Sequence, residues 1–246
     1  MSQEIFLSVV IPAYKEADRI HKILDAILEF EKIKDYNIET IVVVDGALDN
    51  TAEVASKYQD KLKNLKIIDR KENKGKGYTV REGMLEAQGK YVLFSDADNS
   101  TPIEQVDKLL KFRNDYDVMI GSRYVYDGKL AIPQSFVRKI GGRVLNWIIR
   151  TLAVSGIKDT QCGFKLFSKK AAQEIFSKQT FERWSFDIEI LAIARMLGYK
   201  IKEVGITWYD DPHSRVSPIK DGLRMIKDAW TVRKNVKAKK YSRLEN

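Results

Sequence analysis

Two carboxylates one residue apart, Asp96 and Asp98, follow a short apolar run from Tyr91 to Phe94. The run predicts a buried strand, and side chains two residues apart on an extended chain point the same way. Two like charges held on one side repel each other unless a cation lies between them. Mg²⁺ and Mn²⁺ take oxygen ligands of this kind and commonly bind substrate phosphates as well. The pair therefore predicts a metal and phosphate site, although a lone Asp-x-Asp is also typical of a solvated turn.

The elements that must position these carboxylates alternate between strand and helix. Apolar runs predict strands at residues 5–11, 39–44, 65–68, 91–94 and 118–121, and the intervening patterns predict helices at 17–33, 50–58, about 77–87 and from Pro102. This alternation predicts a parallel sheet covered on both faces, whose ligands bind at the carboxyl ends of the strands. Pro12, Asp45, Asp96 and Asp98 all follow predicted strands, so we expect one cleft to collect them.

The second half of the chain has a less regular pattern. It predicts an amphipathic helix at 134–154, a strand at 164–167, helices at 169–176 and 185–197, a strand at 201–208 and a helix at 218–236. We expect a single domain over residues 1–230, with a nucleotide-binding half at 1–122 and an acceptor-binding half at 123–230. Residues 231–246 carry the one run of like charge, which predicts a basic C-terminal tail.

Whole-chain composition limits the class of protein. The 246 residues are 44% hydrophobic, which is enough for a globular core, and the formal charge of +9 favours an anionic partner. The single cysteine, Cys162, excludes an internal disulfide and is typical of a reducing compartment. The start of the chain lacks a signal-peptide pattern, and no uncharged apolar run reaches membrane-spanning length. We therefore expect a cytoplasmic protein, soluble or peripheral to a membrane.

Six segments in this order resemble motifs of the inverting glycosyltransferases of family two, and more narrowly of the dolichyl-phosphate glucosyltransferase type. They are residues 9–16 (VVIPAYKE), 43–51 (VVDGALDNT), 73–77 (NKGKG), 96–98 (DAD), 159–167 (DTQCGFKLF) and 183–189 (RWSFDIE). The last two segments are the most specific. Two positions depart from the family pattern: Val44 replaces the first of two usual aspartates, and Asn99 is an uncommon residue after the metal motif.

The resemblance implies the GT-A fold, a mixed and mainly parallel sheet flanked by helices, with an amphipathic helical extension on the acceptor side. It implies transfer of a hexose to dolichyl or polyprenyl phosphate with inversion at the anomeric carbon. The first candidate for the hexose is glucose, with UDP-glucose as the donor. A Mg²⁺ or Mn²⁺ cofactor and contact with the cytoplasmic face of a membrane follow from the same resemblance. The residues expected to bind the nucleotide sugar are Pro12, Ala13, Tyr14, Glu16, Asp45, Lys76, Gly77, Asp96, Ala97 and Arg215.

A nucleoside diphosphate donor needs recognition of its base and neutralisation of its phosphates. The carboxylate of Asp45 can accept a hydrogen bond from the imide of uracil, and the backbone from Gly75 to Gly77 can approach phosphates closely, with Lys76 adding charge. The expected metal ligands are Asp96, Asp98 and His213, and Arg215 resembles a mobile residue that closes over the diphosphate.

The acceptor site is expected in the second half of the chain. Arg138, Arg143 and Asn146, along the predicted amphipathic helix, can hold a lipid phosphate, and the neighbouring apolar side chains at 147–149 can face a membrane. A phosphate monoester is already anionic, so it needs orientation more than deprotonation. If a general base is used, Asp187 is the first candidate and Asp159 the alternative.

Other functions remain open from the sequence. GDP-mannose as the donor and a saccharide hydroxyl as the acceptor fit the same fold. A basic nucleic-acid-binding protein would fit the charge, but the basic residues are dispersed or C-terminal and no nucleic-acid motif is present, so we expect no nucleic-acid partner. A sugar nucleotidyltransferase is disfavoured because no glycine- and arginine-rich phosphate signature lies near the N-terminus.

Overall fold

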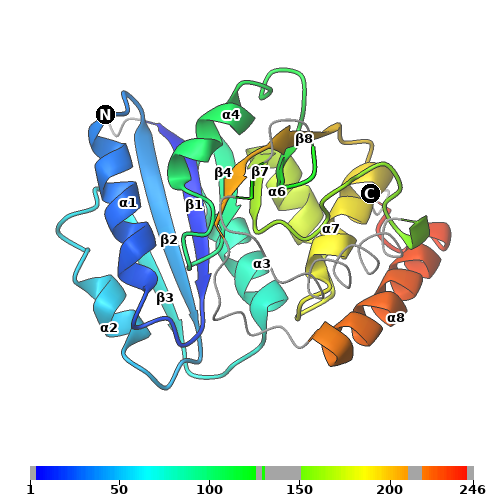
Figure 1. The fold of residues 1–246 in the computed structure, drawn as a ribbon, viewed down its shortest axis with the longest axis horizontal. Coiled ribbons are helices and arrows are strands. Elements are labelled where there is room, and N and C mark those ends of the chain that lie inside the picture. Colours follow the sequence, from blue (N-terminus) through cyan, green and yellow to red (C-terminus); the bar gives the residue numbers. More distant parts are fainter. Residues whose placement is uncertain (1–3, 126–128, 131–150, 210–217, 243–246) are drawn as a thin grey trace.

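The computed structural model describes residues 4–125, 129–130, 151–209 and 218–242 (Figure 1). Its strands are β1 (Ile5–Ala13), β2 (Asn37–Asp45), β3 (Leu65–Arg70), β4 (Tyr91–Ser95), β5 (Val118–Ser122), β6 (Lys129–Leu130), β7 (Phe164–Ser168), β8 (Ile201–Gly205) and β9 (Thr207–Trp208). Seven of them form one sheet in the order β3-β2-β1-β4-β7-β5-β8, and β6 pairs with β9. All pairings are parallel except those of β7, which runs antiparallel to both β4 and β5.

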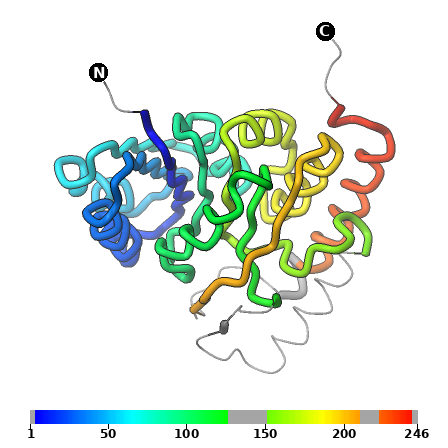
Figure 2. The backbone as a smooth tube through the Cα atoms, turned by 90° about the horizontal axis from the view of Figure 1, so that it is seen from above, coloured from blue at the N-terminus to red at the C-terminus, as the bar shows by residue number. Residues whose placement is uncertain are grey.

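Helices cover both faces of this sheet. They are α1 (Ile20–Lys32), α2 (Thr51–Ser56), α3 (Lys76–Glu86), the 3₁₀ turn η1 (Ile103–Gln105), α4 (Val106–Leu110), α6 (Lys169–Phe176), α7 (Phe186–Met196) and α8 (Pro218–Lys237). Because side chains alternate along a strand, Val9 and Ile11 of β1 belong to one core cluster, with residues of α1, α2 and α4, whereas Val10 belongs to a second cluster, with residues of α3, α6, α7 and α8. Figure 2 shows the N-terminal half at one end of the molecule and α8 at the other.

Helix α1 illustrates how the sequence pattern produces a layer. Ile20, Ile23, Leu24 and Ile27 recur at helical spacing and all four are completely buried against the sheet. Full burial of each such side chain stabilises the fold by about 1.5–3 kcal/mol. The apolar stripe therefore fixes both the helix and its position on the sheet.

Most of the predicted elements are confirmed, and the mixed, mainly parallel sheet with flanking helices is confirmed with them. The antiparallel strand of the mixed sheet is β7, a direction that its apolar run does not specify. Two expectations are wrong in detail. The predicted strand at 201–208 divides at Ile206 into β8 and β9, which belong to different sheets. The segment after Pro102 begins as the 3₁₀ turn η1 and only then becomes α4.

Two further expectations can be compared only in part. The predicted helix at 134–154 lies almost wholly outside the described residues. The predicted tail begins inside α8, which continues to Lys237, and the aromatic ring of Tyr241 is buried in the core. Among the helices that the structure describes, none combines the length and the apolar character needed to cross a bilayer.

Candidate active site

The ends of three neighbouring strands define one edge of the sheet. Strand β1 lies between β2 and β4, and the three strands end at Ala13, Asp45 and Ser95. The ends of these strands, with Pro12, Asp45 and Asp96, therefore lie at one end of the sheet, because parallel neighbours end on the same side. That one cleft collects these residues and Asp98 stays a prediction.

Charged side chains from four segments meet beyond the end of β4. Lys76, the first residue of α3, forms an ion pair with Asp96, with 2.6 Å between Nζ and Oδ1. Asp187 in the first turn of α7 accepts a hydrogen bond from Lys165 of β7, whose side chain is completely buried. The Lys165 ammonium also donates to the carbonyl oxygen of Cys162 at 2.5 Å. The cluster thus holds two lysines and three aspartates, Asp98 being the third.

Burial and neighbouring charges set the protonation of this cluster. Burial raises the pKa of Asp187, and the charges of Lys165 and Lys76 offset only part of that rise. Burial and the adjacent charge of Asp96 likewise raise the pKa of Asp98. Burial alone would lower the pKa of Lys76, but Asp96 and Asp187 outweigh it and hold that pKa above its ordinary value. The cluster therefore keeps a permanent cation beside carboxylates that are less acidic than usual.

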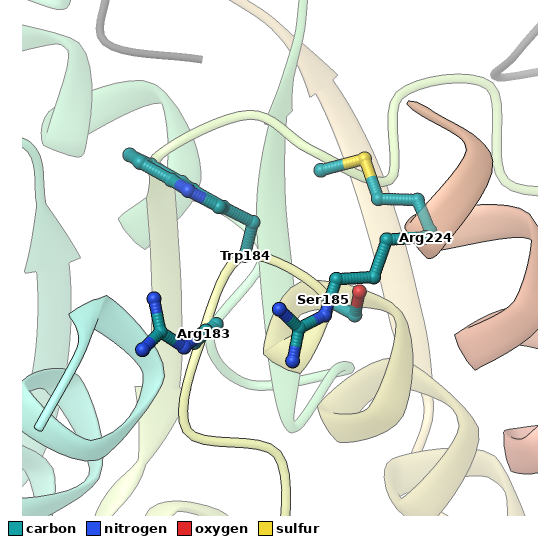
Figure 3. Close-up of a pocket in the computed structure, with 5 residues that line it drawn as sticks. Arg183, Trp184, Ser185 and Arg224 are labelled. Carbon is teal, nitrogen blue, oxygen red and sulfur yellow. The ribbon is translucent and has the colours of Figure 1, made fainter. Parts of the chain in front are cut away.

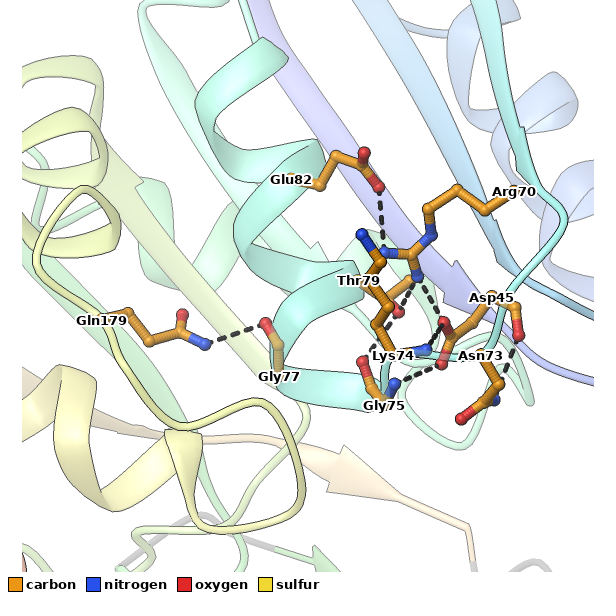
Figure 4. Close-up of polar contacts among 9 residues, drawn as sticks. All are labelled: Asp45, Arg70, Asn73, Lys74, Gly75, Gly77, Thr79, Glu82 and Gln179. Carbon is orange, nitrogen blue, oxygen red and sulfur yellow. Dashed lines mark hydrogen bonds and ion pairs between the residues drawn. The ribbon is translucent and has the colours of Figure 1, made fainter.

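Asp45 organises the loop that precedes α3 (Figure 4). Its carboxylate accepts backbone N–H bonds from Lys74 at 2.8 Å and Gly75 at 2.9 Å, and it forms an ion pair with Arg70. The carbonyl oxygen of Asp45 also accepts from the side chain of Asn73. The predicted contact of Asp45 with uracil stays a prediction; the structure adds a second task, which is to hold the loop carrying Lys76.

The glycines of this loop are required by packing against the protein itself. A Cβ atom on Gly75 would lie 2.6 Å from the carbonyl oxygen of Glu182, and one on Gly77 would lie 2.4 Å from that of Phe181. Gly75 also has φ +98°, a conformation that favours glycine. The sequence pattern around these glycines does not reveal this neighbour, which lies about a hundred positions further along the chain.

A third glycine makes room for the carboxylate of Asp96. A Cβ atom on Gly163 would lie 1.9 Å from Oδ2 of Asp96. The backbone N–H of Asp96 donates to the carbonyl oxygen of Gly163 at 3.1 Å, so the two segments are held together. Gly163 therefore fixes where the Asp96 carboxylate can lie.

Asp159, the alternative base, is in a different environment. Arg123 donates to it three times, from its backbone N–H and from Nε and Nη2 of its guanidinium, at 2.8–3.0 Å. Burial alone would raise the pKa of Asp159, but the charge and hydrogen bonds of Arg123 reverse this and lower it. The guanidinium also lies 5.0 Å from the centre of the Trp208 ring. Asp159 is thus an ionised partner that fixes Arg123, which the sequence analysis did not single out.

A small, partly open pocket lies between the segment that precedes α7 and the helix α8 (Figure 3). Arg183, Trp184, Ser185, Arg224 and Met225 line it, from the start of α7 and from α8. The Trp184 ring also faces the cluster, with its centre 5.3 Å from Nζ of Lys76. The pocket therefore combines two cationic side chains with apolar walls next to the charged site.

The remaining predicted residues divide into two groups. Pro12 and Ala13 are at the end of β1, Tyr14 follows them, Glu16 pairs with Arg19, and the side chain of Ala97 is buried in the core. The second group lies outside the described residues and comprises Arg138, Arg143, Asn146, His213 and Arg215.

Comparison with known proteins decides the family. The sequence model of "Glycosyl transferase family 2" matches residues 8–176. This chain belongs to that family. The dolichyl-phosphate beta-glucosyltransferase of Dictyostelium discoideum is 37% identical over 93% of this chain and 74% of its own length. The enzymes of the same name from Homo sapiens and Saccharomyces cerevisiae are 34% and 36% identical, over 92% and 94% of this chain and 74% and 75% of their own lengths.

Solved structures place the family 2 chain in the GT-A fold. Mannosyl-3-phosphoglycerate synthase from Rubrobacter xylanophilus superposes with a TM-score of 0.70, at 17% identity, over 98% of this chain and 77% of that one. Glucosyl-3-phosphoglycerate synthase from Mycobacterium tuberculosis, in complex with Mn²⁺, UDP and its product, gives 0.68 at 18% identity, over 93% and 80% of the two chains. The expected GT-A fold is therefore confirmed, and the chain is a glycosyltransferase.

The donor set of this glycosyltransferase fits a hard divalent cation. Within the described ranges, no group of three or more His, Cys, Asp or Glu side chains is placed to hold a metal ion. Asp96 and Asp98 nevertheless present carboxylates one residue apart, and one oxygen of Asp98 accepts from the backbone N–H of Ser100 at 2.9 Å. Two protein carboxylates, completed by substrate phosphates and water, are a common ligand set for Mg²⁺.

Proposed function

We propose that this chain transfers glucose from UDP-glucose to the phosphate of dolichyl or another polyprenyl phosphate, with inversion at the anomeric carbon. The observation that carries the proposal is identity of 34–37% over more than 90% of the chain to three enzymes named dolichyl-phosphate beta-glucosyltransferase. The charged cluster beyond β4 supplies chemistry suited to a diphosphate leaving group. A phosphate oxygen of the acceptor attacks the anomeric carbon while the bond to the UDP oxygen breaks on the opposite face.

The donor would bind at the carboxyl edge of β1, β2 and β4. Pro12, Ala13, Tyr14 and Glu16 would frame base and ribose, with Asp45 beneath them. Lys76 and Gly77 begin α3 and would meet the diphosphate chiefly through the lysine charge, because the backbone N–H of Tyr78 is already bonded to the carbonyl oxygen of Glu182. We assign residues 1–122 to this nucleotide-binding half and residues 123–230 to the acceptor half.

Asp96 and Asp98, with His213 as the further expected ligand, would hold Mg²⁺ or Mn²⁺ at the diphosphate. The ion, when bound, would take up the negative charge that develops on the leaving diphosphate. Lys76 already lies at the same carboxylate and would share that task, because its ammonium remains protonated between Asp96 and Asp187. Arg215 would close over the diphosphate from above.

Asp187 is the better candidate for a general base than Asp159. A carboxylate with a raised pKa accepts a proton near neutral pH more readily than one with a lowered pKa. A phosphate acceptor needs little deprotonation, so Asp187 would act chiefly by orienting the acceptor and by balancing the charges of Lys165 and Lys76.

Two sets of residues can receive the acceptor phosphate. Arg138, Arg143 and Asn146 are the first set, proposed from the sequence. The pocket of Arg183 and Arg224 is a second candidate, because two guanidinium groups suit a phosphate and the Trp184 and Met225 walls suit an isoprenoid chain. Such a lipid substrate would place the protein at a membrane surface, and we propose peripheral attachment on the cytoplasmic face.

Calorimetry with UDP-glucose, UDP-galactose, UDP-N-acetylglucosamine and GDP-mannose, each with and without Mn²⁺, tests the donor. We expect Mn²⁺-dependent binding of UDP-glucose, loss of that dependence in Asp96→Ala and Asp98→Ala, and glucosyl transfer to a short polyprenyl phosphate in detergent. Binding of GDP-mannose alone would move the proposal to a mannosyl donor. Binding of none of the four would contradict it and would point to Val44, where the family usually has an aspartate.

A further inference from the structure

A single carboxylate in the core anchors the segment between α6 and α7, residues 177–185. Glu189 of α7 is completely buried. It accepts backbone N–H bonds from Thr180 at 2.9 Å and Phe181 at 2.8 Å, and a hydroxyl bond from the side chain of Thr180 at 2.6 Å. A buried carboxylate with this many donors fixes the backbone that supplies them.

The fourth donor to Glu189 comes from the predicted basic tail. The hydroxyl of Tyr241 donates to Oε1 of Glu189 at 3.0 Å and accepts from the side-chain amide of Asn235 at 3.0 Å. The Tyr241 side chain is 3% exposed, and burial raises the pKa of its hydroxyl, so it remains a donor. Lys178 Nζ also donates to the carbonyl oxygen of Ser242 at 3.2 Å. The C-terminal segment is therefore attached to residues 177–185 directly through Lys178 and indirectly through Glu189.

Residues 177–185 in turn contact the start of α3, which carries Lys76, and form hydrogen bonds with it. The carbonyl oxygen of Glu182 accepts from the backbone N–H of Tyr78 at 3.1 Å, and the amide of Gln179 donates to the carbonyl oxygen of Gly77 at 2.8 Å (Figure 4). The absence of side chains on Gly75 and Gly77 allows the carbonyl oxygens of Glu182 and Phe181, respectively, to approach. Displacing residues 177–185 would therefore displace the N-terminus of α3.

We propose that Tyr241 is a positioning residue for sugar transfer: through Glu189 it fixes residues 177–185, and these fix Lys76 at Asp96. The proposal rests on the proposed function, because it takes Lys76 to bind the donor diphosphate. It assigns a task within the fold to a segment that the sequence presents only as a charged tail. The charges of that segment are not needed for the task, which depends on one phenolic hydroxyl.

The test replaces only that hydroxyl, in the full chain, with Tyr241→Phe. We expect faster hydrogen exchange at the amides of Thr180 and Phe181, and a KM for UDP-glucose raised roughly fivefold, as for loss of one hydrogen bond, with kcat changed less. Glu189→Gln replaces one carboxylate oxygen, the acceptor for two of the four donors, with an NH2 group that cannot accept, and should raise KM further. If that variant does not fold, Tyr241→Phe decides alone.

Tyr58→Phe is the matched control. The Tyr58 hydroxyl also donates to a carboxylate, that of Asp25 at 2.6 Å, but on the α1 and α2 face of the sheet. It should cost comparable thermal stability and leave KM and the exchange of Thr180 and Phe181 unchanged. Equal KM effects of Tyr58→Phe and Tyr241→Phe, or wild-type exchange rates in Tyr241→Phe, would overturn the proposal. A wild-type protein that binds no UDP-glucose would contradict the proposed function instead, and the exchange rates would then decide the role of Tyr241.

Discussion

Asp159 and Asp187 lie on the same half of the molecule, both buried and both paired with a cation, yet their surroundings differ in kind. Arg123 surrounds Asp159 with three donors, and the pKa of Asp159 falls. A single ammonium, that of Lys165, donates to Asp187, and burial raises the pKa of Asp187 despite it. The planar guanidinium matches a carboxylate with several bonds at once, whereas an ammonium acts as a point charge.

The difference separates a fully balanced ion pair from an incompletely balanced one. The Asp159 carboxylate is matched by three donors of Arg123, whose guanidinium lies beside the ring of Trp208. The Asp187 pair is electrostatically coupled to Lys76 and Asp96, so a change of charge at Asp187 reaches the residues proposed to bind the donor. Of two aspartates that the sequence offered as bases, the geometry favours the one whose charges are incompletely balanced.

The largest effect should follow loss of Asp159. Asp159→Asn leaves a guanidinium buried without its carboxylate, and such losses cost about 3–5 kcal/mol. Because the folded pKa of Asp159 is lowered, its contribution is present above the ordinary carboxyl pKa and is lost as pH falls through the folded pKa. Urea unfolding of wild type and variant should therefore differ most near about pH 7 and converge in acid. An equal difference at every pH would contradict the pairing.

Asp187→Asn should act mainly on turnover. We expect kcat to fall by about 100-fold, the low end for a lost general base, because a phosphate acceptor is already anionic. The free energy of unfolding should fall less than in Asp159→Asn, since a lysine, unlike an arginine, can release its proton when its partner is removed. Steady-state kinetics and urea unfolding of both variants check this, and a reversed order would invert the comparison.

Gly163→Ala tests the carboxylate coupled to Asp187. The added methyl group forces the Asp96 carboxylate to move, which its partly exposed side chain can do without unfolding the protein. We expect kcat to fall about tenfold, equivalent to about 1.4 kcal/mol, at nearly unchanged thermal stability. Gly198→Ala is the reciprocal control: φ is +79° and nothing lies near, so it should lose stability and keep full activity.

The smallest effect should come from Arg123→Lys. This substitution keeps the positive charge but loses the planar guanidinium, which donates to Asp159 from two nitrogens. We expect about 1 kcal/mol less stability and a pKa of Asp159 closer to its ordinary value, measurable by carboxyl NMR titration. An unchanged pKa would mean that charge alone, and not the number of donors, separates Asp159 from Asp187.

The sequence predicted those parts of the molecule that depend on local patterns. The apolar stripe of α1 and the runs of β1, β2 and β4 determine their own structure, because burial of alternate or helically spaced side chains is a property of a short segment. Strand ends then predicted that Asp45 and Asp96 would share an edge, since parallel neighbours end together.

The tertiary structure alone decided which groups meet. The antiparallel direction of β7 brings Lys165 beneath Asp187 and Gly163 against Asp96, and no local pattern specifies that direction. Tyr241 reaches Glu189 across about fifty residues of chain for the same reason. The sequence by itself determined the family, most of the elements and the candidate carboxylates, whereas the partners that set their charge and position arise only when distant segments pack, because pKa values and steric fit depend on neighbours in space.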